Sequence, residues 1–238
     1  MTKQEGLAWA SALRSYKYPV DLALFREGES FSDKWFRVNL LHGDWQETVQ
    51  FEARFREFGP KYLEAWYEVV FWKLFNLPFV RNGHTSNVIE RCTSKRAEDL
   101  WAICCKFLES ESRENLTAFQ NLFFETRALP VVATFIAFAE PDRFPMIDVW
   151  VVRWVGAYKQ AYPTQTDELV PWTSLSPAIT LSHWEFYCSW IRWCRSAART
   201  LGESTGLHWR ARDVEMAVFQ NSRELPTGAT LLPLVDSV

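Results

Sequence analysis

The sequence predicts an all-α protein, a single helical unit with two lobes and a cleft between them. Apolar residues recur at helical spacing in successive segments, and Gly, Pro or Asn separates these segments. The apolar alternation typical of a strand is weak everywhere except near 35–41. With 238 residues, 48% of them hydrophobic and 23% charged, the chain can bury a core without disulfides or metals.

Several of the predicted helices begin or end at a recognisable signal. Gly59-Pro60 ends the first, Asn76-Leu77-Pro78 ends the second, and Thr93 or Ser94 can cap the fourth. We expect a turn at 141–145 and a loop at 161–176, where Pro, Ser and Thr gather. The predicted helices, in order, are 51–58, 62–75, 85–92, 97–109, 116–125, 129–138, 148–158, 181–201 and 211–222.

The charge of the chain is slightly negative but unevenly distributed. Its 26 Lys and Arg against 29 Asp and Glu give −3, which excludes a highly basic protein that coats nucleic acid. Residues 107–170 hold five basic and nine acidic side chains, whereas 79–96 are locally basic, with Glu90 alone as an acid. This basic segment predicts either phosphate contacts or a solvated helix rim. Its cationic candidates are Arg81, His84, Arg91, Lys95 and Arg96.

Cysteine usage and the absence of targeting signals favour a cytoplasmic protein. The five cysteines have no framework spacing, which indicates reduced thiols buried as small hydrophobes rather than a metal site. The four histidines show no ligand spacing. The N-terminus lacks a secretory signal, and no stretch of 18 apolar residues could span a membrane. We therefore expect a monomer with no membrane partner, no metal and no cofactor.

Thirteen tryptophans are far above ordinary usage. Each buried indole N–H needs a hydrogen-bond partner, so a core rarely needs so many. Tryptophan is favoured where flat ligands or partners are gripped. The composition alone therefore points to a binding surface rich in aromatic rings.

Segment 124–154 contains a helix end, a tight hairpin at Leu129-Pro130, an apolar helix, a loop bounded by Pro141 and Pro145, and Asp148 at the next helix start. This order resembles the helix-hairpin-helix DNA glycosylase superfamily. In that family a hairpin of the Leu-Pro-Gly-Val-Gly type precedes an apolar helix, and a loop then leads to a catalytic aspartate at a helix start. Leu129-Pro130 and Ala133 match the hairpin and its second helix, and Pro145-Met146-Ile147-Asp148 matches the loop with its aspartate. The helix that follows usually carries an arginine, here Arg153, and 68–73 looks like a helix of divergent members. The resemblance implies DNA as the partner and a two-lobed fold.

Two departures from the family refine this expectation. Val131 and Val132 stand where the family has glycines, which permit positive φ and close approach to a DNA phosphate. Their absence argues against phosphate binding by the hairpin. Bifunctional members also carry a hairpin lysine for Schiff-base chemistry, and no lysine occurs between Lys106 and Lys159. The resemblance therefore implies a monofunctional enzyme that excises a base by hydrolysis.

The implied chemistry requires a carboxylate beneath the sugar. Breaking an N-glycosidic bond develops positive charge on the sugar, which a carboxylate stabilises while it orients or deprotonates the attacking water. We expect Asp148 to have this role, because the helix dipole favours a negative charge at a helix start. The target base must be flipped into a pocket with aromatic walls. Candidates for the pocket are Trp66, Trp72, Trp150 and Trp154, and candidates for phosphate contacts include Lys73, Arg81 and Arg153.

Every one of these features also has a purely structural explanation. Asp148 is a good N-cap for its helix, and tryptophans at helical spacing are often core residues. Lys73 can bury its stem in an apolar helix. Two further pairs are expected to be structural, namely Arg143 with Asp142 in the loop and Arg212 with Glu215 on a surface helix.

Three functions therefore remain open from the sequence. The first is a DNA glycosylase acting on a damaged or modified base, such as a bulky base in bacteriophage DNA, with a role in repair or antiviral defence. The second is a non-catalytic helix-hairpin-helix protein that binds DNA or a protein partner, which the missing glycines favour. The third is a helical interaction domain in which the tryptophans anchor an interface.

Overall fold

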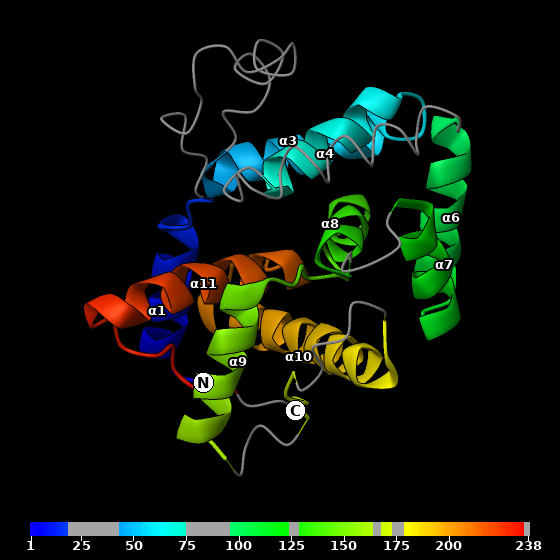
Figure 1. Ribbon diagram of the computed structural model, residues 1–238. Coiled ribbons are helices and arrows are strands. Elements are labelled where there is room, and N and C mark those ends of the chain that lie inside the picture. The colour runs from blue at the N-terminus through cyan, green and yellow to red at the C-terminus, as the bar shows by residue number, and fades with distance from the viewer. Residues whose placement is uncertain (19–42, 75–95, 124–128, 164–167, 173–178, 236–238) are drawn as a thin grey trace, which may run out of the picture. The chain divides into compact units, whose positions relative to one another are not determined.

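The computed structural model describes residues 1–18, 43–74, 96–123, 129–163, 168–172 and 179–235. Within these ranges nine α-helices and one short 3-10 helix form the regular structure, and the extended pairing is limited to one isolated bridge between Lys17 and Asp44. The all-α prediction is confirmed for this part of the chain (Figure 1). The chain divides into a terminal unit (Met1–Tyr16 with Glu140–Val238) and a middle unit (Lys17–Ala139).

The middle unit contains α3 (Trp45–Phe58), α4 (Leu63–Leu74), α6 (Ala97–Glu109), α7 (Arg113–Phe123) and α8 (Leu129–Ala139). Helix α3 begins at Trp45 rather than at the predicted residue 51, because Asp44 and Glu47 form a reciprocal capping box. The predicted cap of α6 is not observed: Arg96 is the N-cap and makes no side-chain cap hydrogen bond. Thr93, Ser94, the helix predicted at 85–92 and the strand-like segment 35–41 lie outside the described residues.

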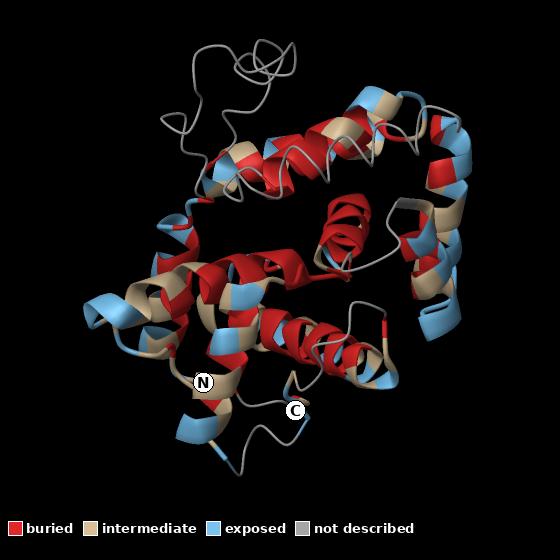
Figure 2. Ribbon diagram, viewed as in Figure 1, coloured by how far each residue is buried: buried red, intermediate tan, exposed pale blue. Residues whose placement is uncertain are grey.

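Helix α8 is the core of the middle unit. It packs against α3, α4, α6 and α7, and all of its residues except Pro130 are buried (Figure 2). A helix that is apolar on every side is stable only when neighbours surround it. Aromatic rings fill the spaces between these helices; the Trp66 ring, for example, lies 4.8 Å from Phe135 and 5.1 Å from Phe55, measured between centroids. Val131 and Val132 are part of this core, inside the first turn of α8.

The terminal unit contains α1 (Lys3–Arg14), α9 (Val149–Ala161), α10 (Leu181–Thr205) and α11 (Ala211–Glu224), followed by the 3-10 helix η2 (Leu225–Thr227). Helix α11 occupies the centre, with α1, α9 and α10 packed around it (Figure 1). Helix α1 was not predicted, although Thr2 and Glu5 form a capping box at its start. The prediction that Asp148 begins a helix is confirmed.

Two predicted surface pairs differ from the structure. Arg212 and Glu215 pair as expected, but both are completely buried in α11 rather than exposed on a surface helix, because α11 is surrounded by other helices. In the turn after α8, Arg143 pairs with Glu140 (Nη1–Oε2 3.0 Å) rather than with Asp142. Asp142 instead pairs with His208, whose Nε2 lies 3.0 Å from Oδ1 of Asp142.

Candidate functional site

The candidate site is built on the loop 140–148, which leads from α8 to α9. Helix α11 holds the first part of this loop through its own N-terminal N–H groups. The backbone N–H of Ala211 donates to the carbonyl of Asp142 (3.2 Å), and that of Arg212 donates to the carbonyl of Pro141 (3.0 Å). The first N–H groups of a helix have no partner within the helix, so the loop carbonyls satisfy two of them. The loop is thereby fixed to the most buried helix of the terminal unit.

Helix α10 holds the second part of the loop through three long side chains. Each donates a hydrogen bond to a loop carbonyl. The loop residues Phe144, Met146 and Ile147 are buried. The donors and their acceptors are Arg195 Nε to Arg143 (2.7 Å), the Tyr187 hydroxyl to Pro145 (3.4 Å) and Trp190 Nε1 to Met146 (2.9 Å). A loop held at so many points gives a following side chain a fixed position, which catalysis requires.

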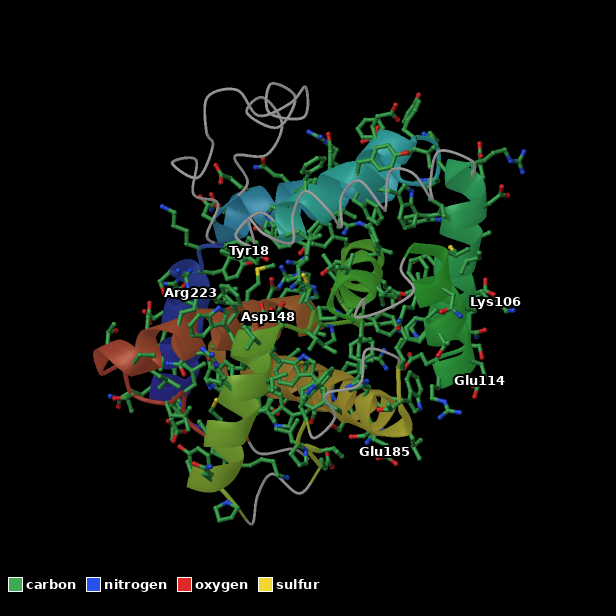
Figure 3. All side chains as sticks on the ribbon, viewed as in Figure 1. Tyr18, Lys106, Glu114, Asp148, Glu185 and Arg223 are labelled. Atoms are coloured by element: carbon green, nitrogen blue, oxygen red, sulfur yellow. The ribbon has the colours of Figure 1, made fainter. Side chains whose placement is uncertain are left out.

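Asp148 stands where this anchored loop ends and α9 begins (Figure 3). Its Oδ1 accepts hydrogen bonds from the backbone N–H of Trp150 (2.8 Å) and of Val151 (2.9 Å). The side chain is half-buried. These two hydrogen bonds satisfy backbone N–H groups that have no partner within α9. Asp148 is therefore the N-cap of α9, and any catalytic role is additional to this capping role.

Two other predicted site residues, Trp150 and Arg153, lie in the first two turns of α9. The guanidinium carbon of Arg153 lies 4.9 Å from the centre of the half-buried Trp150 ring, a cation–π contact. Arg153 itself is exposed, and so is Val149, at 55% of its surface. Ser222 of α11 donates a hydrogen bond to the carbonyl of Trp150 (2.8 Å), which fixes this turn against α11. The first turn of α9 thus joins the Asp148 cap to an aromatic ring, and the second turn places a cation against that ring.

The other three predicted pocket tryptophans belong to the cores of the two units. Trp66 and Trp72 in the middle unit and Trp154 in the terminal unit have no exposed surface. Trp66 donates its indole N–H to the carbonyl of Gly59 (2.8 Å), and Trp154 donates to Asn221 Oδ1 (3.0 Å). The Trp72 ring stacks on Tyr18 at 4.0 Å between centroids. Other side chains cover these rings, so none of them offers a face to a base.

Of the predicted cationic residues, Lys73, Arg96 and Arg153 fall among the described residues. Lys73 is buried in the middle unit, with its ammonium 6.0 Å from the centre of the Tyr18 ring, because α4 is covered on nearly every side. Lys73 is therefore a core residue rather than an accessible phosphate ligand. Arg96 is exposed at the start of α6 and pairs with Asp99 (Nη2–Oδ1 3.1 Å). Arg81, His84, Arg91 and Lys95 lie outside the described residues.

The residues that hold the site in place were missed by the sequence analysis. Tyr187, Trp190, Arg195 and Ser222 bind the loop or the first turn of α9 from positions more than forty residues further along the chain. No spacing or motif connects such positions to Asp148. The contacts depend on the packing of α10 and α11, which a single sequence does not reveal.

Among the described residues, no group of three or more His, Cys, Asp or Glu residues is arranged to hold a metal ion. None of the described helices is long and apolar enough to cross a bilayer. Comparison with known proteins found no family model, no curated protein and no solved structure that matches the chain.

Proposed function

We propose that this protein is a monofunctional DNA glycosylase of the helix-hairpin-helix type, with Asp148 as the essential carboxylate. The observation that carries the proposal is the placement of Asp148 at the end of a loop anchored by two helices and at the start of α9, whose first two turns carry Trp150 and the exposed Arg153. The order of an apolar helix, a Pro-bounded loop and an aspartate at a helix start also agrees with the resemblance. The two helical units would correspond to the two lobes of such a fold, whose cleft stays a prediction.

In this proposal Asp148, Arg153 and Trp150 have separate tasks. Asp148 stabilises the positive charge that develops on the deoxyribose as the N-glycosidic bond breaks, and it accepts a proton from the attacking water. The exposed guanidinium of Arg153 binds a DNA phosphate. Trp150 offers its half-buried ring to the flipped nucleotide. The base leaves with the bonding electrons and takes up a proton, and the hydroxyl of water adds to the sugar.

A base-release assay tests the proposal directly. The protein is incubated with single- and double-stranded oligonucleotides that carry alkylated, oxidised, deaminated or bulky modified bases, and alkali-labile abasic sites are counted. We expect release of at least one base by the native chain and a loss of about 10²–10⁴-fold in Asp148→Asn. Asp44→Asn is the matched control, because Asp44 also caps a helix through its carboxylate but lies in the middle unit. No release from any substrate contradicts the function.

A second candidate is a non-catalytic protein of the same fold that binds DNA. The burial of Val131 and Val132 inside α8 favours it, because these positions offer no glycine backbone to a phosphate. This candidate predicts salt-dependent DNA binding without base release. In either case Arg153→Gln should weaken binding on every sequence and reduce the salt slope by about one unit.

A further inference from the structure

The middle unit contains a groove that the proposed function does not use. It has a volume of about 430 Å³ and opens at the end of α3 and the first half of α4. Pockets of this size accommodate small organic ligands. The groove is lined by Arg54, Phe58, Tyr62, Glu64, Ala65 and Glu68.

The lining carries an excess of negative charge. Glu64 and Glu68 are one helical turn apart on the same face of α4, where like charges repel. Arg54 comes from α3 and forms an ion pair with Glu68, which is 7% exposed. Burial raises the pKa of Glu68, Arg54 lowers it in part, and the neighbouring Glu64 raises it further. Two carboxylates against one guanidinium leave the groove one negative charge in excess, and Glu64 is exposed at its edge.

Aromatic rings form the other wall of the groove. The rings of Phe58 and Tyr62 have their centroids 6.0 Å apart and their planes tilted by 51°. Tyr62 is 54% exposed, which is unusual for a large ring and leaves much of it accessible. The face of an aromatic ring attracts a cation. Ala65, between the two carboxylates in sequence, adds a small apolar surface for an aliphatic stem.

We propose that this groove binds a guanidinium group carried on an aliphatic stem. A cation complements the excess negative charge, and the carboxylate of Glu64 with the ring of Tyr62 would receive it. A guanidinium suits this site better than an ammonium, because its planar donors match a carboxylate, it stacks on aromatic rings and it loses its water shell more easily. The ligand is either a free small guanidino compound or an arginine side chain of a peptide. The proposal is independent of Asp148.

The test is a titration of the full chain followed by NMR or calorimetry. The probe is butylguanidinium, and butylurea is the neutral control because it has nearly the same shape without the charge. We expect saturable binding of butylguanidinium and none of butylurea in the same range. Equal binding of the two compounds, or no saturable binding of butylguanidinium, overturns the proposal.

Substitutions then locate the binding. Glu64→Gln removes an exposed carboxylate and leaves the Arg54–Glu68 pair intact, so the fold should be unaffected; we expect weaker binding by roughly two- to five-fold. Tyr62→Leu should weaken it by a similar factor. Glu114→Gln on α7 is the matched control, since this exposed glutamate of the same unit lies outside the groove (Figure 3). Equal losses in the Glu64 and Glu114 variants contradict the location.

Two further measurements distinguish the source of the ligand and the independence of the site. Arginine blocked as its N-acetyl methylamide binds at least as tightly as butylguanidinium if the ligand is a peptide side chain. It binds more weakly if the groove takes a free small molecule. Asp148→Asn should bind butylguanidinium like the native chain, so a failure of the glycosylase proposal and a failure of this one are separable.

Discussion

The capping role of Asp148 and its proposed catalytic role can be separated by comparing Asp148→Ala with Asp148→Asn. In the structure one oxygen of this carboxylate accepts two backbone hydrogen bonds, from Trp150 at 2.8 Å and from Val151 at 2.9 Å. Alanine removes the acceptor and the charge together. Asparagine removes only the charge, because its amide oxygen can take the same position. Both variants therefore lose the carboxylate charge, but only Asp148→Ala also loses the helix cap.

The expected magnitudes follow from this geometry. Loss of an N-cap costs about 0.5–2 kcal/mol, and two accepted hydrogen bonds place Asp148→Ala in the upper half, at about 1–2 kcal/mol. For a chain of this size that corresponds to roughly 2–4 °C in Tm for each kcal/mol. Asparagine ranks with aspartate as a cap, so Asp148→Asn should cost less than about 0.5 kcal/mol. Base release, by contrast, should fall by about 10²–10⁴-fold in both variants.

The assay combines urea unfolding, followed by tryptophan fluorescence, with base release at a temperature where all variants are folded. Asp44→Ala is the control, because it removes the N-cap of α3 at a distance in sequence from the loop 140–148. It should lose stability and retain activity. The reasoning is refuted if Asp148→Asn retains base release, or if it loses as much stability as Asp148→Ala while the control behaves as expected.

Three further predictions follow from buried groups outside the site. Arg212→Met alone should destabilise the terminal unit by about 3–5 kcal/mol in urea unfolding, because it leaves Glu215 charged and buried. The double variant Arg212→Met with Glu215→Leu should recover most of this lost stability. Burial raises the pKa of Glu68 above its ordinary 4.5, so the native state holds this proton more tightly than the unfolded chain. The free energy of unfolding of the native protein, relative to that of Glu68→Gln, should therefore be greatest below pH 4.5. It should fall as the pH rises through the raised pKa. Burial also raises the pKa of the Cys194 thiol well above its ordinary value. Iodoacetamide at pH 8 should therefore label the half-buried Cys188 first and leave Cys194 unmodified, as read from peptide mass spectra. Equal labelling of the two cysteines contradicts the burial of Cys194.

Local signals in the sequence were sufficient for most helices but not for all of their ends. Helix α6 has the predicted bounds, because its apolar period is regular and acidic residues fill its first turn. Helix α1 and the start of α3 were missed, although Thr2 with Glu5 and Asp44 with Glu47 have the capping-box spacing. These two capping boxes indicate a helix start, but the apolar pattern that follows each of them is weak.

Burial was harder to predict than secondary structure, for a physical reason. Helical spacing shows which residues share a face, but it does not show whether other elements cover the opposite face. Helices α8 and α11 are covered on nearly all sides, so Arg212 and Glu215 are buried as a pair. The same effect places Trp66 and Trp154 in the cores instead of a base pocket. The high tryptophan count is thus explained in large part by packing, with the indole N–H groups satisfied inside the units.

The cap at Asp148, like the cap at Ser112, is one-directional, whereas three other side-chain caps of the described helices are reciprocal. Thr2, Asp44 and Thr180 form reciprocal capping boxes, in which the third helical residue returns a hydrogen bond to the cap. At Asp148 that third residue is Val151, which has no group to return, so the bonds run in one direction only. The returning residues elsewhere are Glu5, Glu47 and His183. A helix start selected for stability alone would gain from a glutamate at that position. A second carboxylate there would also compete for a cation or repel a phosphate, and the first turn of α9, which contains Trp150, has no acidic residue.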